Sequence, residues 1–159
     1  MALIAQTKHV DGVFPAPTAL ETGEVMAVRG SLTLSANPTD NDTTAHVVLP
    51  AGCLPVDLIL DASDLDTNGT PTIAISAGVL NAAKTDIDTA AANGGAAWIV
   101  TSTVAQAGGL VRPTTNTITR CSVSTSDRVI GLKYTTASAT FASGIVGVTL
   151  LYRHAPRGE

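Results

Sequence analysis

The sequence predicts an all-β protein that folds as a single-domain antiparallel β-sandwich of about eight strands. Runs rich in Thr, Val, Ile and Ala alternate apolar and polar residues, so each run buries one face as a strand. The clearest examples are the two closing runs, DRVIGLKYTT and GIVGVTLLYR, whose apolar residues share one parity. Turn-forming residues separate the runs, and almost no stretch has the apolar spacing of a helix. Short turns mixed with two longer connections are typical of a two-sheet sandwich with Greek-key crossings.

The chain has the length and composition of one domain with an aliphatic core. Its 159 residues suffice for a single core, which we expect in a sandwich spanning 24–154, after an arm at 1–23 and before a short tail at 155–159. Hydrophobic residues make up 45% of the chain but aromatic residues only 3%, so Ala, Val, Ile and Leu must form the core. These side chains bury less apolar area than aromatic rings. We therefore expect association with further copies of the chain to add burial.

The opening segment, 1–23, predicts an extended N-terminal arm. Pro15 and Pro17 favour extended backbone and remove two N–H donors, which argues against a helix. Phe14 is one of only two phenylalanines and is the expected anchor on the chain's own surface or on a neighbour. Phe14, Pro15 and Pro17 are therefore the candidate partner-binding residues. A loosely ordered terminus is the alternative.

The first two sandwich strands are expected in EVMAVRGSLTLSA at 24–36 and TTAHVVLP at 43–50, joined by a turn rich in Asn and Asp. Gly30 marks a bulge or bend in the first strand. His46 is expected on the outer face of the second. The inward-facing positions are Met26, Val28, Leu32, Leu34, Ala45, Val47 and Leu49.

The next two strands are expected in PVDLILDA at 55–62 and TPTIAISAGVL at 70–80. Asp57 and Asp61 fall on the outward parity of the first of these, where they keep a solvent-facing sheet polar. The inward-facing positions are Val56, Leu58, Leu60, Ala62, Ile73, Ile75, Ala77 and Val79.

The second half of the chain begins with its longest break, 81–95, which is Ala-rich and has room for one helical turn. AAWIVTST at 96–103 is expected to form a strand that contains Trp98. TITRCSV at 117–123 is expected to form another, with Cys121 as a small buried thiol. The closing strands follow, with inward-facing Ile130, Leu132, Tyr134, Val146, Val148, Leu150 and Tyr152.

Charge and hydropathy exclude several classes of protein. The formal charge is −4, and the nine Lys and Arg residues are scattered apart from a small group at Arg153, His154 and Arg157, so no basic stripe for nucleic acid is present. No run approaches the ~18 apolar residues of a membrane helix, and the N-terminus lacks the pattern of a secretory signal. Cys53 and Cys121 follow no metal or redox spacing, so we expect free thiols in a reducing compartment.

One loop has the opening pattern of a calcium site. Asp64, Asp66, Asn68 and Gly69 match D-x-D-x-N-G, but the twelfth position, which needs a bidentate Glu, is Ile75. We expect these side chains to cap backbone amides of a hairpin loop instead. The three histidines, His9, His46 and His154, lie in different segments without ligand spacing, so no metal or cofactor is expected.

Catalytic motifs are also missing from the sequence. The nucleophile elbow G-x-S-x-G does not occur, and the Gly-rich stretches NGG and QAGG lack the Lys-Ser/Thr of a phosphate-binding loop. Asp57 and Asp61 are the one pair of carboxylates on a common strand face, and their expected role is surface polarity rather than glycoside hydrolysis. The chain is therefore not expected to be an enzyme.

Three stretches resemble the head decoration, or cement, proteins of tailed bacteriophages. They are VDLILDASDLDTNGTPTIAISAGVL at 56–80, WIVTSTVAQAGG at 98–109 and DRVIGLKYTTASATFASGIVGVTLLYRHA at 127–155. The resemblance implies a protein on the outer surface of the virion, made in the host cytoplasm, which binds the major capsid protein. It also implies homotrimers at local three-fold axes that tie adjacent capsomers together, with no catalytic residues.

The fold within this resemblance, and the function itself, each have alternatives. Decoration proteins are jelly-roll-like sandwiches, β-tulip barrels or immunoglobulin-like domains, and the count of eight strands favours the jelly roll. Another virion part, such as a tail, connector or fibre module, is the main functional alternative. A carbohydrate-binding module would need exposed aromatic rings, whereas Trp98, Tyr134 and Tyr152 fall in patterns that predict burial.

Overall fold

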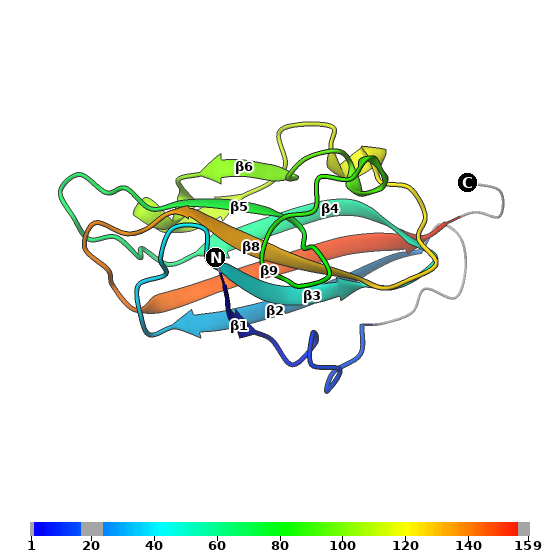
Figure 1. Cartoon of the computed structure of the whole chain (residues 1–159), viewed down its shortest axis with the longest axis horizontal. Helices are drawn as coiled ribbons and strands as arrows, with labels where there is room; N and C mark the ends of the chain where they lie inside the picture. The colour runs from blue at the N-terminus through cyan, green and yellow to red at the C-terminus, as the bar shows by residue number, and fades with distance from the viewer. Residues whose placement is uncertain (1, 17–23, 156–159) are drawn as a thin grey trace.

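A computed structural model describes residues 2–16 and 24–155 and shows a two-layer β-sandwich with only short 3₁₀ turns between strands (Figure 1). The described residues form nine strands: β1 (Leu3–Gln6), β2 (Val25–Leu34), β3 (Thr43–Leu49), β4 (Cys53–Ala62), β5 (Ala74–Val79), β6 (Ile99–Ser102), β7 (Gly109–Val111), β8 (Arg128–Thr136) and β9 (Gly144–His154). The 3₁₀ turns are η1 (Ala91–Asn93), η2 (Val104–Gln106) and η3 (Ile118–Arg120). The prediction of an all-β sandwich is confirmed.

The strand order makes the sandwich a jelly roll. One sheet has the order β1-β3-β8-β5-β6 and the other β2-β9-β4-β7. From β2 onward the chain pairs as one long hairpin, with β2 on β9, β3 on β8, β4 on β7 and β5 on β6, all antiparallel. Rolling this hairpin up adds the pairs β4–β9 and β5–β8. Two four-stranded sheets connected in this way are the double Greek key of a jelly roll, to which β1 is added at one edge.

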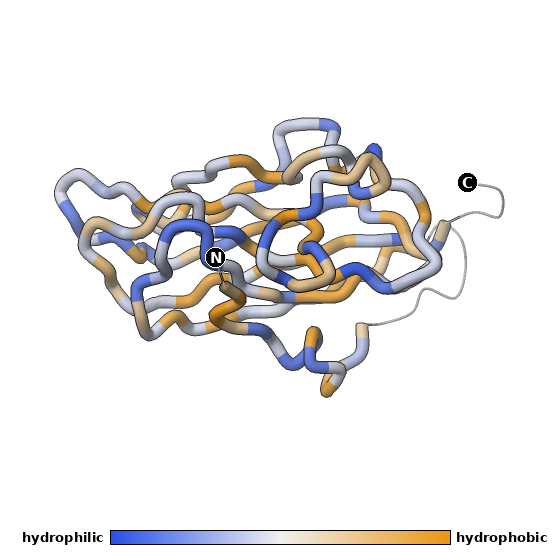
Figure 2. Tube along the Cα trace, in the orientation of Figure 1, coloured by the Kyte–Doolittle hydropathy of each residue, from blue (hydrophilic) through white to orange (hydrophobic). Residues whose placement is uncertain are grey.

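The core lies between the two sheets and is closed by the strands with the clearest alternation. β8 lies between β3 and β5, and β9 lies between β2 and β4, so each has a neighbour on both sides. Apolar residues accordingly gather along the strands, as Figure 2 shows. All seven residues that the sequence analysis placed inward on these two strands are fully buried. They are Ile130, Leu132, Tyr134, Val146, Val148, Leu150 and Tyr152.

A bulge in β3 overturns the prediction that His46 faces outward. The register places Thr44 opposite Leu132 and Val47 opposite Ile130, so an extra residue interrupts the alternation between Ala45 and Val47. A register shift of this kind re-aims the side chain at the bulge. His46 is consequently 0% exposed. Its Nδ1 lies 3.2 Å from the Gly30 carbonyl oxygen and its Nε2 lies 3.0 Å from the Thr44 hydroxyl.

A second bulge, in β4, corrects the inward placement of Val56. Pro55 pairs with Tyr152 and Asp57 with Leu151, so Val56 is the extra residue and is exposed. Proline cannot donate a ladder hydrogen bond and is tolerated at bulges and unpaired edges. Pro55 lies at such a place, because the neighbouring β7 pairs only with the far end of β4. Residues beyond the bulge, such as Leu58, face the core as predicted.

The strand predicted at 117–123 is wrong. Those residues form η3 followed by irregular chain, and the short β7 supplies the eighth jelly-roll strand instead. The Ser122 N–H donates to the Ala92 carbonyl of η1 at 3.0 Å rather than to a sheet. Ile118 and Cys121 are both buried at this end of the sandwich, although residues three apart would lie on opposite faces of a strand. The stretch 81–95, which has room for one helical turn, contains the 3₁₀ turn η1.

Gly30 is required by a close backbone approach between β2 and β3. A Cβ atom at this position would collide with the carbonyl oxygen of His46 and lie 3.1 Å from a methyl carbon of Thr7. We expect Gly30→Ala to lower the free energy of unfolding by about 2–3 kcal/mol, measured by urea denaturation, because neither backbone can move without breaking strand pairing. Gly69→Ala is the control, since a Cβ there has no atom within 4 Å. Equal midpoints for the two variants would contradict this account of the approach.

Burial of His46 predicts acid-sensitive stability. Burial is the main cause that lowers the pKa of this imidazole from 6.5 to about 4, and the charge of Arg29 lowers the pKa further. The hydrogen bond to Gly30 and the charge of Asp61 raise the pKa but do not offset this effect. The unfolded chain therefore binds a proton at a higher pH than the folded chain does. The stabilisation is fully present above pH 6.5 and is lost as the pH falls towards 4, by about 2 kcal/mol over that interval. Urea denaturation at pH 7 and pH 4.5 measures this loss. His46→Gln should show a clearly smaller loss, and an unchanged loss would assign it to other groups.

Candidate functional site

Asp66, which lies in the loop that matches the opening of a calcium site, is a buried cap that ties two loops together. Its carboxylate accepts backbone N–H groups of Thr72 at 2.7 Å, Ile73 at 3.2 Å, Ala139 at 2.9 Å and Thr140 at 2.8 Å. Burial alone would raise the pKa of this carboxyl, but the backbone hydrogen bonds outweigh it and lower the pKa well below its usual value. The loop after β4 is thereby fastened to the turn between β8 and β9.

The neighbouring side chains of the same motif also cap amides. The Asp64 carboxylate accepts the Asp66 N–H at 3.0 Å, and the Asn68 side-chain oxygen accepts the Thr70 N–H at 2.9 Å. Within the described residues no group of three or more His, Cys, Asp or Glu side chains gathers in a way that would hold a metal ion. The predicted capping role of the motif is confirmed.

The two outward carboxylates of β4 are both paired with arginines. Asp61 forms a two-oxygen ion pair with Arg29 of β2, across β9, with the second contact at 2.8 Å. This pair crosses above Gly147, where any Cβ would collide with the guanidinium. The Arg29 hydrogen bond lowers the pKa of Asp61 against the effect of burial. Asp57 pairs with Arg112 at 2.7 Å. On the outer face of the sheet, Asp61 thus ties β4 to β2 across β9, and Asp57 ties β4 to the chain that follows β7.

The two cysteines are free and buried, as predicted. Burial raises the pKa of both thiols, although the charge of Arg128 acts in the opposite direction. A thiol with a raised pKa carries little thiolate at neutral pH and is a weak nucleophile. Cys53 and Cys121 are therefore core residues rather than reaction centres.

The described part of the N-terminal segment is fastened to the sandwich. β1 pairs with β3 in parallel, so the sheet gains an edge strand. Beyond β1, the Thr7 N–H donates to the Ala45 carbonyl at 2.9 Å and the Thr7 hydroxyl donates to the His46 carbonyl. These contacts cover the bulge of β3 and complete the burial of His46.

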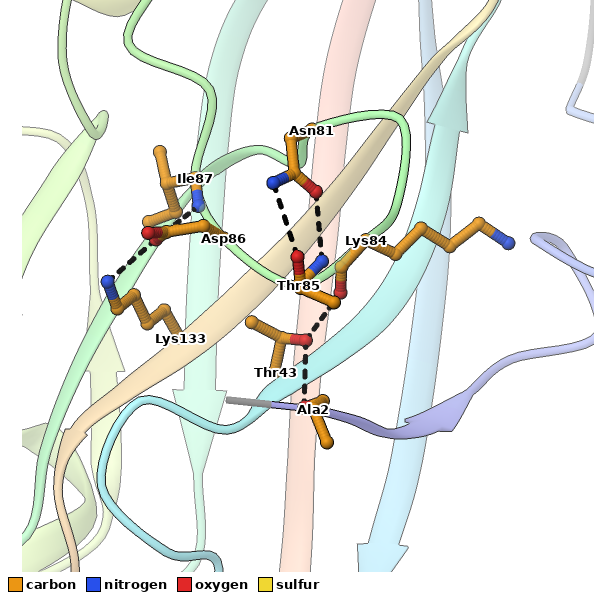
Figure 3. A network of polar contacts seen from close by, with 8 residues as sticks. All are labelled: Ala2, Thr43, Asn81, Lys84, Thr85, Asp86, Ile87 and Lys133. Carbon is orange, nitrogen blue, oxygen red and sulfur yellow. Dashed lines mark hydrogen bonds and ion pairs between the residues drawn. The ribbon is translucent and has the colours of Figure 1, made fainter.

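The loop at 81–88 and the start of β1 are held together through Thr43 of β3 (Figure 3). The Thr43 hydroxyl lies between two carbonyl oxygens, that of Lys84 at 2.6 Å and that of Ala2 at 3.2 Å. An ion pair of 2.6 Å between Lys133 of β8 and Asp86 holds the loop against the sheet. The start of β1 is therefore held beside β3 and the loop at 81–88.

A turn at residues 7–14 holds Phe14 in a fixed and exposed position. The N–H groups of Val13 and Phe14 both donate to the Lys8 carbonyl, at 2.9 and 3.1 Å. His9 Nδ1 lies 2.8 Å from the Phe14 carbonyl oxygen, and the Lys8 ammonium lies 5.5 Å from the centre of the Phe14 ring. Yet Phe14 is 53% exposed and Val13 is 60% exposed. Pro15 is exposed as well, whereas Pro17 lies outside the described residues.

This turn and β2 enclose a groove of about 440 Å³ on the edge of the sandwich. Lys8, His9 and Phe14 line it from the N-terminal segment, and Arg29 and Ser31 line it from β2. Exposed apolar surface beside a groove is a common feature of surfaces that bind other molecules. Sequence reasoning identified Phe14 but missed the groove, since its two walls are distant in the sequence.

Among the residues that the structure describes, no helix is long and apolar enough to cross a membrane.

Comparisons with known proteins point to viral shells. No protein-family model matches the chain, and no curated protein matches it. A solved chain from the capsid of Ralstonia phage GP4 is similar, with 32% sequence identity and a TM-score of 0.83 over 97% of this chain and 99% of that chain. A solved chain from the cyanophage Pam1 capsid asymmetric unit has 24% identity and a TM-score of 0.63 over 89% of this chain and 93% of that chain, which shows a shared fold.

The two roles considered for Asp66 predict different responses. We expect Asp66→Asn to lower the urea midpoint clearly, because an amide nitrogen would face backbone N–H donors that now have a carboxylate. Asp64→Asn keeps a side-chain oxygen that accepts the one N–H bonded there, that of Asp66, so it should change the urea midpoint much less. Millimolar calcium should leave the melting temperature of the unmodified protein unchanged. A calcium-dependent rise that Asp66→Asn abolishes would instead assign the loop to ion binding.

Proposed function

Because this chain belongs to a family of phage capsid proteins that includes a chain of the Ralstonia phage GP4 capsid, we propose that it decorates the outer surface of a phage head. The observation that carries the proposal is the end-to-end match: 97% of this chain aligns with 99% of a chain that is part of a capsid. The chain is accordingly a structural protein of the virion. Its proposed partner is the major capsid protein.

The architecture supports attachment to a shell that already exists. The eight jelly-roll strands all pair within the chain, and the core between them is filled with the chain's own side chains. A domain that buries its core alone does not need the shell in order to fold, and its negative charge keeps it dispersed before binding. The edge that carries the exposed residues Phe14 and Pro15 is not used in the fold of the domain and is available for docking.

A trimer that cements adjacent capsomers is the proposed working form. Three copies around one axis would each contribute a separate contact with the shell. Once one copy is attached, the effective concentration of the others for their contacts rises, so weak single contacts sum to a firm attachment. Exposed apolar residues outside the N-terminal segment are available for contacts between copies: Val25, Val56, Val100, Leu110 and Ile145. Nucleic acid and membrane are not proposed partners.

A tail, connector or fibre module remains the second candidate within the virion. A carbohydrate-binding role is disfavoured by burial, since Trp98, Tyr134 and Tyr152 are each at most 1% exposed and cannot stack on a sugar. Electron cryo-microscopy of purified protein mixed with heads that lack it distinguishes these roles. Threefold density on the outer surface supports decoration and cementing, whereas rings, elongated assemblies or bare heads would contradict it.

Phe14 is the proposed anchor on the shell. We expect Phe14→Ala to weaken binding to such heads about tenfold or more, which corresponds to a loss of at least ~1.4 kcal/mol from an aromatic anchor. Thr114→Ala is the control, because Thr114 is an exposed residue outside the N-terminal segment and is not among the apolar residues proposed for contacts between copies. Binding is measured as head occupancy against protein concentration. Equal curves for both variants and the unmodified protein would exclude Phe14 as an anchor.

A simple truncation of residues 1–23 is a poor test of the same idea. It would remove β1 and the Thr7 contacts that cover β3 and His46, so a loss of binding would mix docking with stability. Phe14→Ala avoids this, since the ring is about half exposed and lies beyond those contacts.

A further inference from the structure

The groove at the edge of the sandwich has features of a receptor for an extended peptide. It lies between the turn of the N-terminal segment and the middle of β2, two parts that run beside each other at one edge of the molecule (Figure 1). Its volume of about 440 Å³ accommodates a few residues in extended conformation. Phe14 and Leu32 supply apolar surface on its two walls, and Ser31 is an exposed residue on its floor.

The wall formed by β2 is the outer edge of its sheet. In the described part of the chain β2 pairs with a single strand, β9, over all ten of its residues. The carbonyl of Gly30 points away from β9, but it is bonded to His46, and the backbone of His46 approaches Gly30 closely, so the edge is closed at this residue. Because backbone groups of a strand alternate in direction, those of Leu32 also point away from β9, and the edge is open there. Open edges of this kind bind extended segments through main-chain hydrogen bonds.

The charge of the groove selects an acidic occupant. The ionisable side chains that line it are Lys8, His9 and Arg29, with no carboxylate among the lining residues. Arg29 is neutralised by Asp61, which leaves Lys8 as the permanent net charge. This local positive charge contrasts with the net charge of −4 of the whole chain. Pairing between the β2 edges of two copies would bring these like charges together, which disfavours a second copy at this edge.

We propose that the groove receives an extended, acidic segment of the shell protein, which pairs with the edge of β2 at Leu32. The segment places an apolar side chain against Phe14 and Leu32 and a carboxylate beside Lys8. This inference rests on the proposed decoration function and specifies the chemistry of its partner. In this arrangement Phe14 is one wall of a receptor site.

Two exposed residues test the groove without disturbing the core. Ser31→Trp fills the groove, and Lys8→Glu reverses its charge; both should weaken binding to decoration-free heads at least tenfold. The matched controls are Ser126→Trp, at an exposed serine before β8, and Arg120→Glu, at an exposed arginine of η3, and both should bind as the unmodified protein does. Raising the salt concentration should weaken binding of the unmodified protein more than that of Lys8→Glu.

The outcomes separate this inference from the function on which it rests. If the unmodified protein does not bind heads, the decoration function itself fails. If it binds, and both groove variants bind equally well, decoration stands and the groove proposal is overturned. A photo-crosslinker placed at Ser31 in decorated heads identifies the occupant. Attachment to an acidic segment of the shell protein supports the proposal, whereas attachment to another copy of this chain, or to residues 17–23 of the same chain, overturns it.

Discussion

The sandwich depends on two central strands, each of which holds its sheet together from both sides. β9 pairs with β2 and β4, and β8 pairs with β3 and β5, so removal of either would split a sheet into separate parts. Both carry an unbroken alternation of core residues, and this pattern specifies which face of each strand is buried. The edge strands depend on them, and so does every feature at the edges, including the groove beside β2.

Alternation in the sequence predicted the fold wherever the strands are regular. In β2, β5, β8 and β9 the expected inward residues, from Val28 to Leu150, are buried or pack against the core. The two failures of parity, His46 and Val56, both lie at register shifts, where one extra residue reverses the faces. No local signal marks the bulge at His46, since it is set by the approach of β2 and by Thr7 on another segment.

The candidate site was predictable only in part, for a similar reason. Phe14 and Pro15 stand out in the sequence through their rarity and their backbone preferences, and both are exposed in the structure. The positive charge of the groove did not stand out, because Lys8 lies in the N-terminal segment and Arg29 lies in the first sandwich strand. In the loop that contains Asp66, by contrast, the sequence shows a pattern that the structure does not use for ion binding. Asp66 fits a metal-binding pattern locally, but its role is set by amides of Ala139 and Thr140, which follow much later in the chain.

The pairing of the first jelly-roll strand with the last has a consequence for biogenesis. Val25 is matched with Arg153, so β2 has no partner strand while the ribosome is still making the middle of the chain. Such long-range closure is slow compared with local folding, and the nascent polypeptide must stay unaggregated until β9 emerges. The low aromatic content and the net negative charge favour an unaggregated chain until β9 has been synthesised. The wall of the groove that belongs to β2 therefore gains its partner strand only when β9 has been synthesised.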